Sequence, residues 1–262
     1  MRNLRLPPVV LVVAGNDPSG GAGLAADIQA LSRFGAHPAP VAAALTVQDT
    51  RNVSRVLPLE PDFVREQAHR VLEDMPVAAV KLGLLGSAAV GRAVAALLAS
   101  YPKLPLVVDP VLKASGGSVL AEDELLDVYL QDLFPHAMLV TPNADEGRRL
   151  APEARDSAAR AAVLLGTGAR HVLMKGADED TPEVLNTLYS ADGGSLAYTW
   201  PRLPGVYHGS GCTLASAAAA LLARGRPVPE AVQEAQRYTW EALRRGWKLG
   251  HGQLIPDRQV PE

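Results

Sequence analysis

The chemistry that the sequence could carry is most concentrated in the stretch from His208 to Gly225, HGSGCTLASAAAALLARG. Its Gly209-Ser210-Gly211 segment predicts a tight turn, and an alanine-rich helix follows at once. Backbone N–H groups at a helix N-terminus point to one spot and favour an anion there. A phosphoryl group in transfer carries negative charge on three oxygens and needs such donors. The stretch therefore indicates a site for phosphate.

Cys212 stands in the first turn of that helix and is the single cysteine of the chain. A helix N-terminus lowers the pKa of a thiol from about 8.5 toward the neutral range. Cys212 could therefore act as a base or as a polar contact at the transfer site. The alternative is a small buried side chain that packs under the helix. The neighbouring glycines and the start of the helix favour the chemical interpretation.

A second glycine-rich stretch, VVAGNDPSGGAG from Val12 to Gly23, follows an apolar run. Gly21 to Ala26 fits the G-x-G-x-x-A pattern of dinucleotide-binding turns, with Asp49 near the expected acidic position. Gly15 to Gly20 resembles half of a P-loop, but Gly21-Ala22 stands where a lysine and a serine or threonine must follow. The DPS segment has no role in a dinucleotide turn. The loop alone is therefore weak evidence for a nucleotide.

Short apolar, β-branched runs alternate with longer helical patterns along most of the chain. Such alternation predicts an α/β protein with a doubly wound, mainly parallel central sheet flanked by helices. The expected strands are Val9–Ala14, Pro40–Thr46, Ala78–Leu82, Leu106–Asp109, Met138–Thr141 and His171–Lys175. The expected helices are Gly21–Phe34, Asp62–Glu73, Ser87–Ala99, Glu122–Leu130, Ser157–Leu165, Cys212–Ala223 and Pro229–Arg245. Glu183–Ser190 and Leu196–Trp200, separated by a glycine turn, predict an antiparallel edge hairpin.

Polar and glycine residues gather at the carboxyl ends of these strands. In doubly wound sheets, ligands bind in the crevice at that edge. The residues are Gly15–Asp17, Gln48, Gly83, Asp109, Asn143 and Lys175–Gly176. The clustering predicts one binding site along the edge, and no repeat or composition break divides residues 1–262, so we expect a single domain.

The overall composition limits the classes of partner. A net charge of −3 offers no broad basic surface for nucleic acid. Hydrophobic residues at 48% and charged residues at 20% are typical of a globular protein with a sizeable core. No apolar run approaches 18 residues and no signal-peptide pattern is present, so we expect a cytoplasmic protein without a membrane partner. The lone cysteine, which excludes an internal disulfide framework, agrees with that location.

Eight motifs, in order along the chain, resemble those of the hydroxymethylpyrimidine/phosphomethylpyrimidine kinases of thiamine biosynthesis, in the ribokinase-like superfamily. They are AGNDPSGGAG with Asp27, LTVQDT, EPDFV, VKLGLLGS, VVDPVL, TPNADE, VLMKG and HGSGCTLASA. The resemblance runs from about Val9 to Pro256. It implies a ribokinase-like fold and ATP-dependent phosphorylation of 4-amino-5-hydroxymethyl-2-methylpyrimidine and its monophosphate, with Mg²⁺. Because relatives are often dimers, a homodimer is also expected.

The resemblance implies a set of ring-binding residues. The loop that starts at Gly15 would hold the pyrimidine and its hydroxymethyl end. Asp27 and Gln48 would hydrogen-bond the aminopyrimidine edge, a task that suits an amide because it supplies a donor and an acceptor together. Leu84 would pack against the ring where relatives commonly carry methionine. From the residues alone, Asp27 could equally be a solvated helix residue and Gln48 a turn residue.

The resemblance also implies a phosphate and metal side. Asn143 and Glu146 match the N-x-x-E motif of the superfamily, with Glu146 acting on Mg²⁺ directly or through water; the same pair fits a helix capping box. Lys175 would reach the nucleotide phosphates, since an unpaired buried lysine is otherwise costly. Asp109 would lie near metal and phosphates, or else simply begin a loop.

Cys212 stands where most of the superfamily has a catalytic aspartate, and the resemblance makes it the activator of the substrate hydroxyl. The N–H groups of Gly209 to Cys212, together with Lys175 and Mg²⁺, would stabilise the transferred group. Ser210 replaces a usual threonine and keeps its hydroxyl. The segment Lys113–Gly117 is one residue shorter than usual, so no contact is carried over to it.

Three alternatives remain beside the thiamine-pathway kinase. A pyridoxal kinase is the nearest, because Cys212 could add to the aldehyde of pyridoxal. A pyrimidine-sensing domain without turnover predicts loss of the phosphate residues, yet Asn143, Glu146 and Lys175 are present. Such a sensor also expects a fused effector domain, for which the chain leaves no room. A dinucleotide oxidoreductase needs a hydride-transfer site that no downstream motif supplies.

Overall fold

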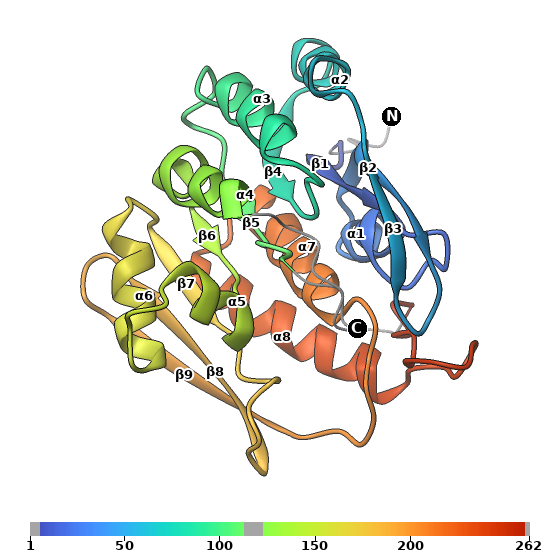
Figure 1. Cartoon of the computed structure of the whole chain (residues 1–262), viewed down its shortest axis with the longest axis vertical. Helices are drawn as coiled ribbons and strands as arrows, with labels where there is room; N and C mark the ends of the chain where they lie inside the picture. The colour runs from blue at the N-terminus through green and yellow to red at the C-terminus, as the bar shows by residue number, and fades with distance from the viewer. Residues whose placement is uncertain (1–5, 113–122, 260–262) are drawn as a thin grey trace, which may run out of the picture.

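The computed structural model describes residues 6–112 and 123–259 and contains one nine-stranded sheet in that part of the chain (Figure 1). The strand order is β3-β2-β1-β4-β5-β6-β7-β8-β9. β1 to β7 are parallel except β3, which pairs with β2 antiparallel, and β8 and β9 form the antiparallel edge hairpin. The strands are β1 Val9–Asn16, β2 His37–Gln48, β3 Val53–Pro58, β4 Val77–Leu82, β5 Leu106–Val108, β6 Leu139–Val140, β7 His171–Met174, β8 Glu183–Ser190 and β9 Ser195–Pro201.

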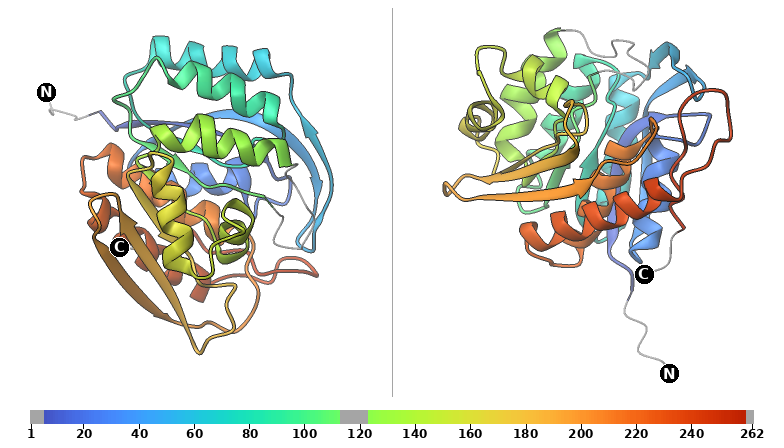
Figure 2. Two further views of the ribbon diagram at one scale, coloured as in Figure 1. Left: turned by 60° about the vertical axis from the view of Figure 1, so that its left-hand side comes forward. Right: turned by 90° about the horizontal axis from the view of Figure 1, so that it is seen from below.

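Helices cover both faces of this sheet (Figures 1 and 2). Successive side chains of a strand point to opposite faces, so Leu11 and Val13 of β1 enter one core while Val10 and Val12 enter the other. The first core lies beneath α2, α3, α4 and α6, and the second beneath α1, α7 and α8. The helices are α1 Gly23–Arg33, α2 Pro61–Asp74, α3 Ala88–Leu98, α4 Asp123–Val128, α5 Ala144–Leu150, α6 Ser157–Gly166, α7 Ser210–Ala223 and α8 Val228–Arg244.

α7 is the central helix of the second layer. Thr213 to Leu222 are all buried, which is the pattern of a helix enclosed on every side. Its run of alanines lets α1 and α8 pack closely against it while the sheet lies beneath. The small side chains thus place the N-terminus of α7 at the carboxyl edge of the sheet.

The predicted α/β architecture, a mainly parallel sheet with an edge hairpin, is confirmed. β3 was not predicted, because it is a short strand at the opposite edge whose side chains are mostly exposed and whose apolar pattern is weak. Element ends also differ: α7 begins at Ser210, two residues before the expected start. The helix expected at Glu122–Leu130 is α4 followed by a π-helical turn, Tyr129–Leu133.

A buried ion pair joins three of these elements. Lys81 of β4 and Asp27 of α1 are both 0% exposed, and their Nζ and Oδ1 atoms lie 2.8 Å apart. Ser216 of α7 donates its hydroxyl to the same carboxylate oxygen at 2.7 Å. Burial alone would lower the pKa of Lys81, but the Asp27 carboxylate raises it above its ordinary value. Lys81 is therefore a buried ammonium ion that holds α1 and α7 against the sheet.

We predict that Lys81→Met lowers the free energy of unfolding by about 3–5 kcal/mol, because it leaves a buried carboxylate without its partner. The matched control is Arg92→Met, which breaks an exposed pair with Glu124 at 2.6 Å and should cost less than about 1 kcal/mol. Urea unfolding of both variants measures the difference. Equal losses in the two variants would show that Lys81 contributes no more than a surface charge.

Candidate active site

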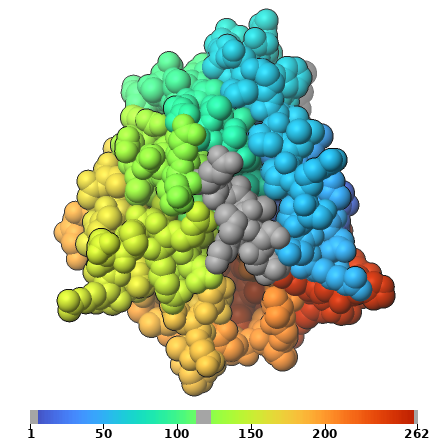
Figure 3. All heavy atoms as spheres, in the orientation of Figure 1, coloured from blue at the N-terminus to red at the C-terminus, as the bar shows by residue number. Residues whose placement is uncertain are grey.

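A cavity of about 640 Å³ opens at the carboxyl ends of the parallel strands. In Figure 3 a hollow opens on this face beside the orange segments that follow β9. Eleven predicted site residues line the cavity, and they come from six strand ends, the first turn of α5 and the start of α7. They are Gly15, Gln48, Leu84, Asp109, Asn143, Glu146, Lys175, Gly209, Ser210, Gly211 and Cys212. The structure thus gathers residues nearly two hundred positions apart in sequence.

The turn before α7 has the backbone that the glycines predicted. Gly209 adopts a left-handed conformation, with φ +71°. A Cβ atom there would lie 2.0 Å from the carbonyl oxygen of Gly21, so no larger residue fits. The first N–H groups of a helix have no partner within it, and those of Ser210 and Gly211 begin α7 beside the cavity. The expected anion-binding turn therefore faces the site.

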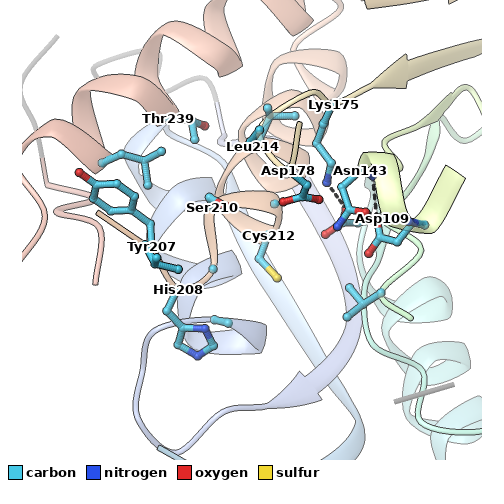
Figure 4. A pocket seen from close by; sticks show the side chains of 18 of the residues that line it. Asp109, Asn143, Lys175, Asp178, Tyr207, His208, Ser210, Cys212, Leu214 and Thr239 are labelled. Carbon is cyan, nitrogen blue, oxygen red and sulfur yellow. Dashed lines mark hydrogen bonds and ion pairs between the residues drawn. The ribbon is translucent and has the colours of Figure 1, made fainter. Parts of the chain in front are cut away.

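Lys175 and Asp109 form an ion pair beside this turn (Figure 4). Lys175 Nζ lies 3.0 Å from Asp109 Oδ1, which also accepts the Thr141 hydroxyl at 3.0 Å. Burial would lower the pKa of Lys175, but Asp109 and Glu146 raise it, so the side chain is a cation. A Cβ atom on Gly211 would lie 3.1 Å from Lys175 Nζ, which places the ammonium directly against the α7 turn.

Asn143 and Glu146 form the capping box that their spacing allowed. Asn143 Oδ1 accepts the Glu146 N–H at 2.8 Å, and Glu146 Oε2 accepts the Asn143 N–H at 2.8 Å. Burial raises the pKa of Glu146 to about 8; Lys175 opposes the rise and Asp109 adds to it. A cation near this buried carboxyl group would stabilise its ionised form, so the capping role and a metal-binding role of Glu146 are compatible.

The described residues hold no group of three or more His, Cys, Asp or Glu side chains arranged for a metal ion. Mg²⁺ does not require one, because it usually keeps several waters and takes one or two carboxylates together with substrate phosphates. Asp109 and Glu146 both line the cavity and are both buried acids. The donor set therefore fits Mg²⁺ bound with a nucleotide, and does not fit a metal held by protein alone.

The expected fall in the pKa of Cys212 is wrong for the ligand-free protein. Burial, together with the Asp27 and Asp109 carboxylates, raises the pKa of this thiol to about 11. Lys81 and a hydrogen bond from the Gly23 N–H oppose the rise without cancelling it. The helix N-terminus was the favourable influence visible in the sequence, whereas the two carboxylates and the loss of water depend on the fold. Cys212 is consequently a thiol at neutral pH.

Asp27 does not line the cavity. It is fully buried one helical turn beyond Gly23, where its carboxylate contacts Lys81 and Ser216. Its other carboxylate oxygen, Oδ2, is buried without a hydrogen-bond partner, and the expected hydrogen bond from Asp27 to a ring stays a prediction. An acidic residue in the middle of a helix pattern looks solvated in the sequence, because the lysine that pairs with it comes from a strand 54 positions away.

Two residues beside Gln48 had no individual role predicted from the sequence. Asp17 is 5% exposed and accepts hydrogen bonds from the N–H groups of Ser19 and Ala22, both at 2.8 Å. His208, also 5% exposed, places Nε2 2.8 Å from Asp17 and 2.7 Å from the Gln48 amide. The sequence offers one signal for His208, its position directly before the glycine turn; its partners are 160 and 191 residues away.

Another wall of the cavity is formed by β8, β9, α7 and α8. Trp200, Leu214 and Thr239 line it, together with a buried amide network. In that network Gln236 Oε1 accepts from Asn186 at 2.8 Å and from the Trp200 indole at 3.1 Å. An aromatic and aliphatic wall with a few fixed polar groups suits a flat heterocycle. The shortened loop Lys113–Gly117 lies outside the described residues.

A family model described as phosphomethylpyrimidine kinase matches residues 17–257 of the chain. The chain belongs to this family. The hydroxymethylpyrimidine/phosphomethylpyrimidine kinase of Streptomyces coelicolor is 39% identical, over 94% of this chain and 92% of the relative. The enzyme of the same name from Escherichia coli is 36% identical, over 92% of this chain and 94% of the relative.

Bifunctional members of the family extend beyond the matched region. The thiamine biosynthesis bifunctional protein ThiED of Geobacter sulfurreducens is 41% identical over 93% of this chain and 50% of the relative. The chain thus spans about half the length of that protein, and about half of a probable bifunctional enzyme from rice. The phosphomethylpyrimidine kinase match therefore corresponds to one part of these longer proteins.

Solved structures confirm the ribokinase-like fold of this phosphomethylpyrimidine kinase family member. The pyridoxal kinase of Staphylococcus aureus with AMP-PCP and pyridoxal has a TM-score of 0.87 at 27% identity, covering 96% of this chain and 93% of that one. The phosphomethylpyrimidine kinase of Clostridium difficile has a TM-score of 0.77 at 32% identity, covering 90% and 99%. No helix among the described residues combines the length and apolar character needed to cross a membrane.

We predict that iodoacetamide alkylates Cys212 slowly at neutral pH in the ligand-free protein. With the pKa raised to about 11, the thiolate fraction at pH 7 is about 10⁻⁴. The labelling rate should therefore rise about tenfold per pH unit from pH 7 to 10, as measured by mass spectrometry. Because the chain has one cysteine, Cys212→Ser supplies the unlabelled control. A rate that levels off below pH 8.5 would contradict the buried-thiol account.

Proposed function

We propose that this chain transfers the γ-phosphoryl group of ATP to the hydroxymethyl oxygen of 4-amino-5-hydroxymethyl-2-methylpyrimidine, and then phosphorylates the resulting monophosphate. One observation carries the proposal. Gln48, Lys175, Asp109 and Cys212, which lies in the first turn of α7, all line one cavity. Relatives that carry the corresponding name share 35–39% identity over most of this chain.

The pyrimidine would lie between the loop after β1 and the end of β2. Gly15 gives the ring close access to backbone, and Leu84 packs within 2.9 Å of the position that a Cβ atom on Gly15 would take. Leu84 would cover one face of the ring, and the Gln48 amide would bind its edge with a donor and an acceptor.

The phosphates would lie on the α7 turn. The N–H groups of Ser210, Gly211 and Cys212 and the Lys175 ammonium are fixed donors for the charge of the transferred group. Structural neighbours bound to AMP-PCP support ATP as the donor. Asp109 and Glu146 would hold Mg²⁺, which neutralises charge on the phosphates when bound. Asn143 keeps the Glu146 carboxylate in position through the capping box.

Cys212 would receive the proton of the substrate hydroxyl. The thiol would first lose its own proton to water. As the bond from the substrate oxygen to the γ-phosphorus then forms and the bond from phosphorus to the ADP oxygen breaks, the hydroxyl becomes acidic and its proton passes to the thiolate sulfur. A pKa near 11 makes the ionised sulfur a strong acceptor, although a scarce one. The Lys81 ammonium is the fixed cation that favours the ionised form.

The direct test compares kcat/KM for the pyrimidine alcohol, its monophosphate and pyridoxal with ATP and Mg²⁺. The proposal expects both pyrimidines to exceed pyridoxal by about 10²-fold or more, since only they match the Gln48 edge. Chelation of Mg²⁺ should abolish turnover. Pyridoxal is the second candidate substrate because the Staphylococcus aureus structure contains it at a TM-score of 0.87. A preference for pyridoxal would replace the proposed substrate while leaving the phosphate site intact.

We predict that Cys212→Ala lowers kcat about 10²-fold or more with little change in KM for the pyrimidine, because the side chain acts on the proton and not on the ring. Cys212→Asp introduces the acid found in most of the superfamily, and its kcat should exceed that of Cys212→Ala by at least about tenfold. Steady-state kinetics of the two variants provide the measurement. Near-normal turnover of the alanine variant would return Cys212 to a packing role.

The homodimer and the cytoplasmic location expected from the sequence stay predictions. Small-molecule substrates, without nucleic acid or membrane, agree with the ligand-bound kinase neighbours. Sedimentation of the purified protein would determine its oligomeric state.

A further inference from the structure

Five residues form an unbroken chain of polar contacts along the wall of the cavity that would meet the ring. Thr46 Oγ1 lies 2.9 Å from the Asn16 carbonyl oxygen and 3.2 Å from one end of the Gln48 amide. The other end of that amide lies 2.7 Å from His208 Nε2, which is 2.8 Å from Asp17 Oδ2. All five residues line the cavity, and His208 comes from the far side of the sequence, next to the α7 turn.

The groups at both ends of this series of contacts, the Asp17 carboxylate and the Asn16 carbonyl, can only accept hydrogen bonds. Asp17 already accepts hydrogen bonds from the N–H groups of Ser19 and Ala22 and from the Ser19 hydroxyl. Burial raises the pKa of Asp17, but the hydrogen bonds from His208 and Ser19 bring it below its ordinary value, so it is a carboxylate. His208 Nε2 must then carry a proton. At the other end the Asn16 carbonyl takes the single hydroxyl proton of Thr46.

These two ends determine the amide between them. The single Nε2–H of His208 lies between Asp17 Oδ2 and the near end of the Gln48 amide, which share it in a bifurcated hydrogen bond. Because the protonated Nε2 has no free lone pair, that near end of the amide must be its oxygen and not its NH₂ group. Facing the lone pairs of Thr46, the far end must be its NH₂ group. The structure places the amide nitrogen toward His208, which sets two donors against each other. The two ends have the same shape, so a half-turn of the amide removes this donor–donor contact without moving another atom. Nδ1 of His208 is buried and has no hydrogen-bond partner among the described residues.

We propose that His208, held by Asp17, is a specificity-determining residue that fixes the polarity of the Gln48 amide, meaning which end is the oxygen and which is the NH₂ group. Thr46 supports the same polarity from the other end. The amide then offers the cavity one free lone pair on the His208 side and one free N–H on the Thr46 side. This inference rests on the proposed role of Gln48 in binding the ring. It assigns the ligand class: heterocycles with an amino donor next to a ring-nitrogen acceptor, in that order.

The fixed polarity also orients the substrate. Around the proposed pyrimidine, the 2-methyl group, N3, the 4-amino group and the 5-hydroxymethyl group follow one another. With the amino group bound to the oxygen on the His208 side, the hydroxymethyl group lies farther along the same direction. His208 directly precedes Gly209, so that direction leads to the α7 turn and Cys212. The reverse polarity would turn the hydroxymethyl group toward Thr46, away from the turn.

The test uses two ligands of equal shape and opposite polarity. The 4-amino substrate presents a donor and then an acceptor, whereas its 4-oxo analogue presents an acceptor and then an N–H donor. A site with fixed hydrogen bonds rejects a mismatched partner strongly. We therefore expect the natural protein to favour the amino compound over the oxo compound about 10³-fold in kcat/KM, with a parallel ratio of dissociation constants by calorimetry.

His208→Phe removes the hydrogen-bond donor but keeps a flat ring. The histidine ring packs closely against Gly21, since a Cβ atom on Gly21 would lie 2.2 Å from His208 Cδ2. The amide can then rotate. We expect the amino/oxo ratio to fall to within about tenfold of unity, because affinity for the amino compound decreases while affinity for the oxo compound increases. Equal losses for both compounds, with the ratio preserved, would overturn the proposal, since a packing role weakens both alike.

Thr46→Val provides an independent variant at a half-exposed position, in case His208→Phe does not fold. It should reduce the ratio by about tenfold, whereas Thr46→Ser should keep it. An unchanged ratio in Thr46→Val, taken with a His208→Phe protein that does not fold, also overturns the proposal. His171→Phe, at a histidine that bonds Ser190 at 2.9 Å outside the cavity, is the control and should leave the ratio unchanged.

Failure of the proposed function has a different signature. If Gln48→Ala binds the amino compound as tightly as the natural protein, Gln48 does not bind the ring and both claims fall. If the natural protein binds and discriminates the two compounds but His208→Phe keeps the ratio, the kinase proposal stands and the polarity inference alone is overturned.

Discussion

The buried ion pair between Lys81 and Asp27 is the constraint on which the site depends. It joins β4 to α1, and the Ser216 hydroxyl adds α7. Asp27 lies one helical turn beyond Gly23, and Ser216 lies one turn beyond Cys212. The same contact that holds the two helices thus sets their N-termini against each other, and the Gly23 N–H bonds to the Cys212 sulfur. A charge pair in the core of the fold positions a reacting atom at its edge.

Two buried ion pairs lie at and beneath the cavity. Lys81 faces Asp27 in the core, and Lys175 faces Asp109 at the cavity wall. Each pair is buried, so each charge would be costly without its partner. Arg202, which bonds the carbonyl oxygens of Ala177, Glu179 and Thr181, also lines the cavity. Burial, with the Asp27 and Asp109 carboxylates, keeps Cys212 a thiol before ligands bind, and the two acids Asp109 and Glu146 fit a divalent cation bound together with phosphates.

The strand ends show how far sequence reasoning reaches. Because parallel strands carry their ligands at one edge, the polar residues after β2, β5, β6 and β7 could be grouped before any coordinates were known, and Gln48, Asp109, Asn143 and Lys175 do line one cavity. The family resemblance added what those residues hold. The ion pair of Asp27 could not be predicted in this way, since an acid within a helix pattern gives no sign of a lysine on another strand.

Contacts between residues far apart in the sequence could not be predicted from local sequence patterns. The pKa of Cys212 depends on two carboxylates and on lost water, which the local helix start does not reveal. The Asp17–His208–Gln48 contacts join a loop, a strand end and a turn that only the folded sheet brings together. β3 was missed because an exposed edge strand carries little apolar signal. Local patterns predicted the elements, and tertiary contacts decided the chemistry.

The most direct test of this account is a crystal structure with AMP-PCP, Mg²⁺ and the pyrimidine alcohol bound together. The account predicts the γ-phosphate on the N–H groups that begin α7, and the hydroxymethyl oxygen about 3–3.5 Å from both the γ-phosphorus and the Cys212 sulfur. The 4-amino group should lie on the His208 side of Gln48. A pyrimidine bound with its hydroxymethyl group turned away from α7, or a γ-phosphate remote from that turn, would contradict the central claim.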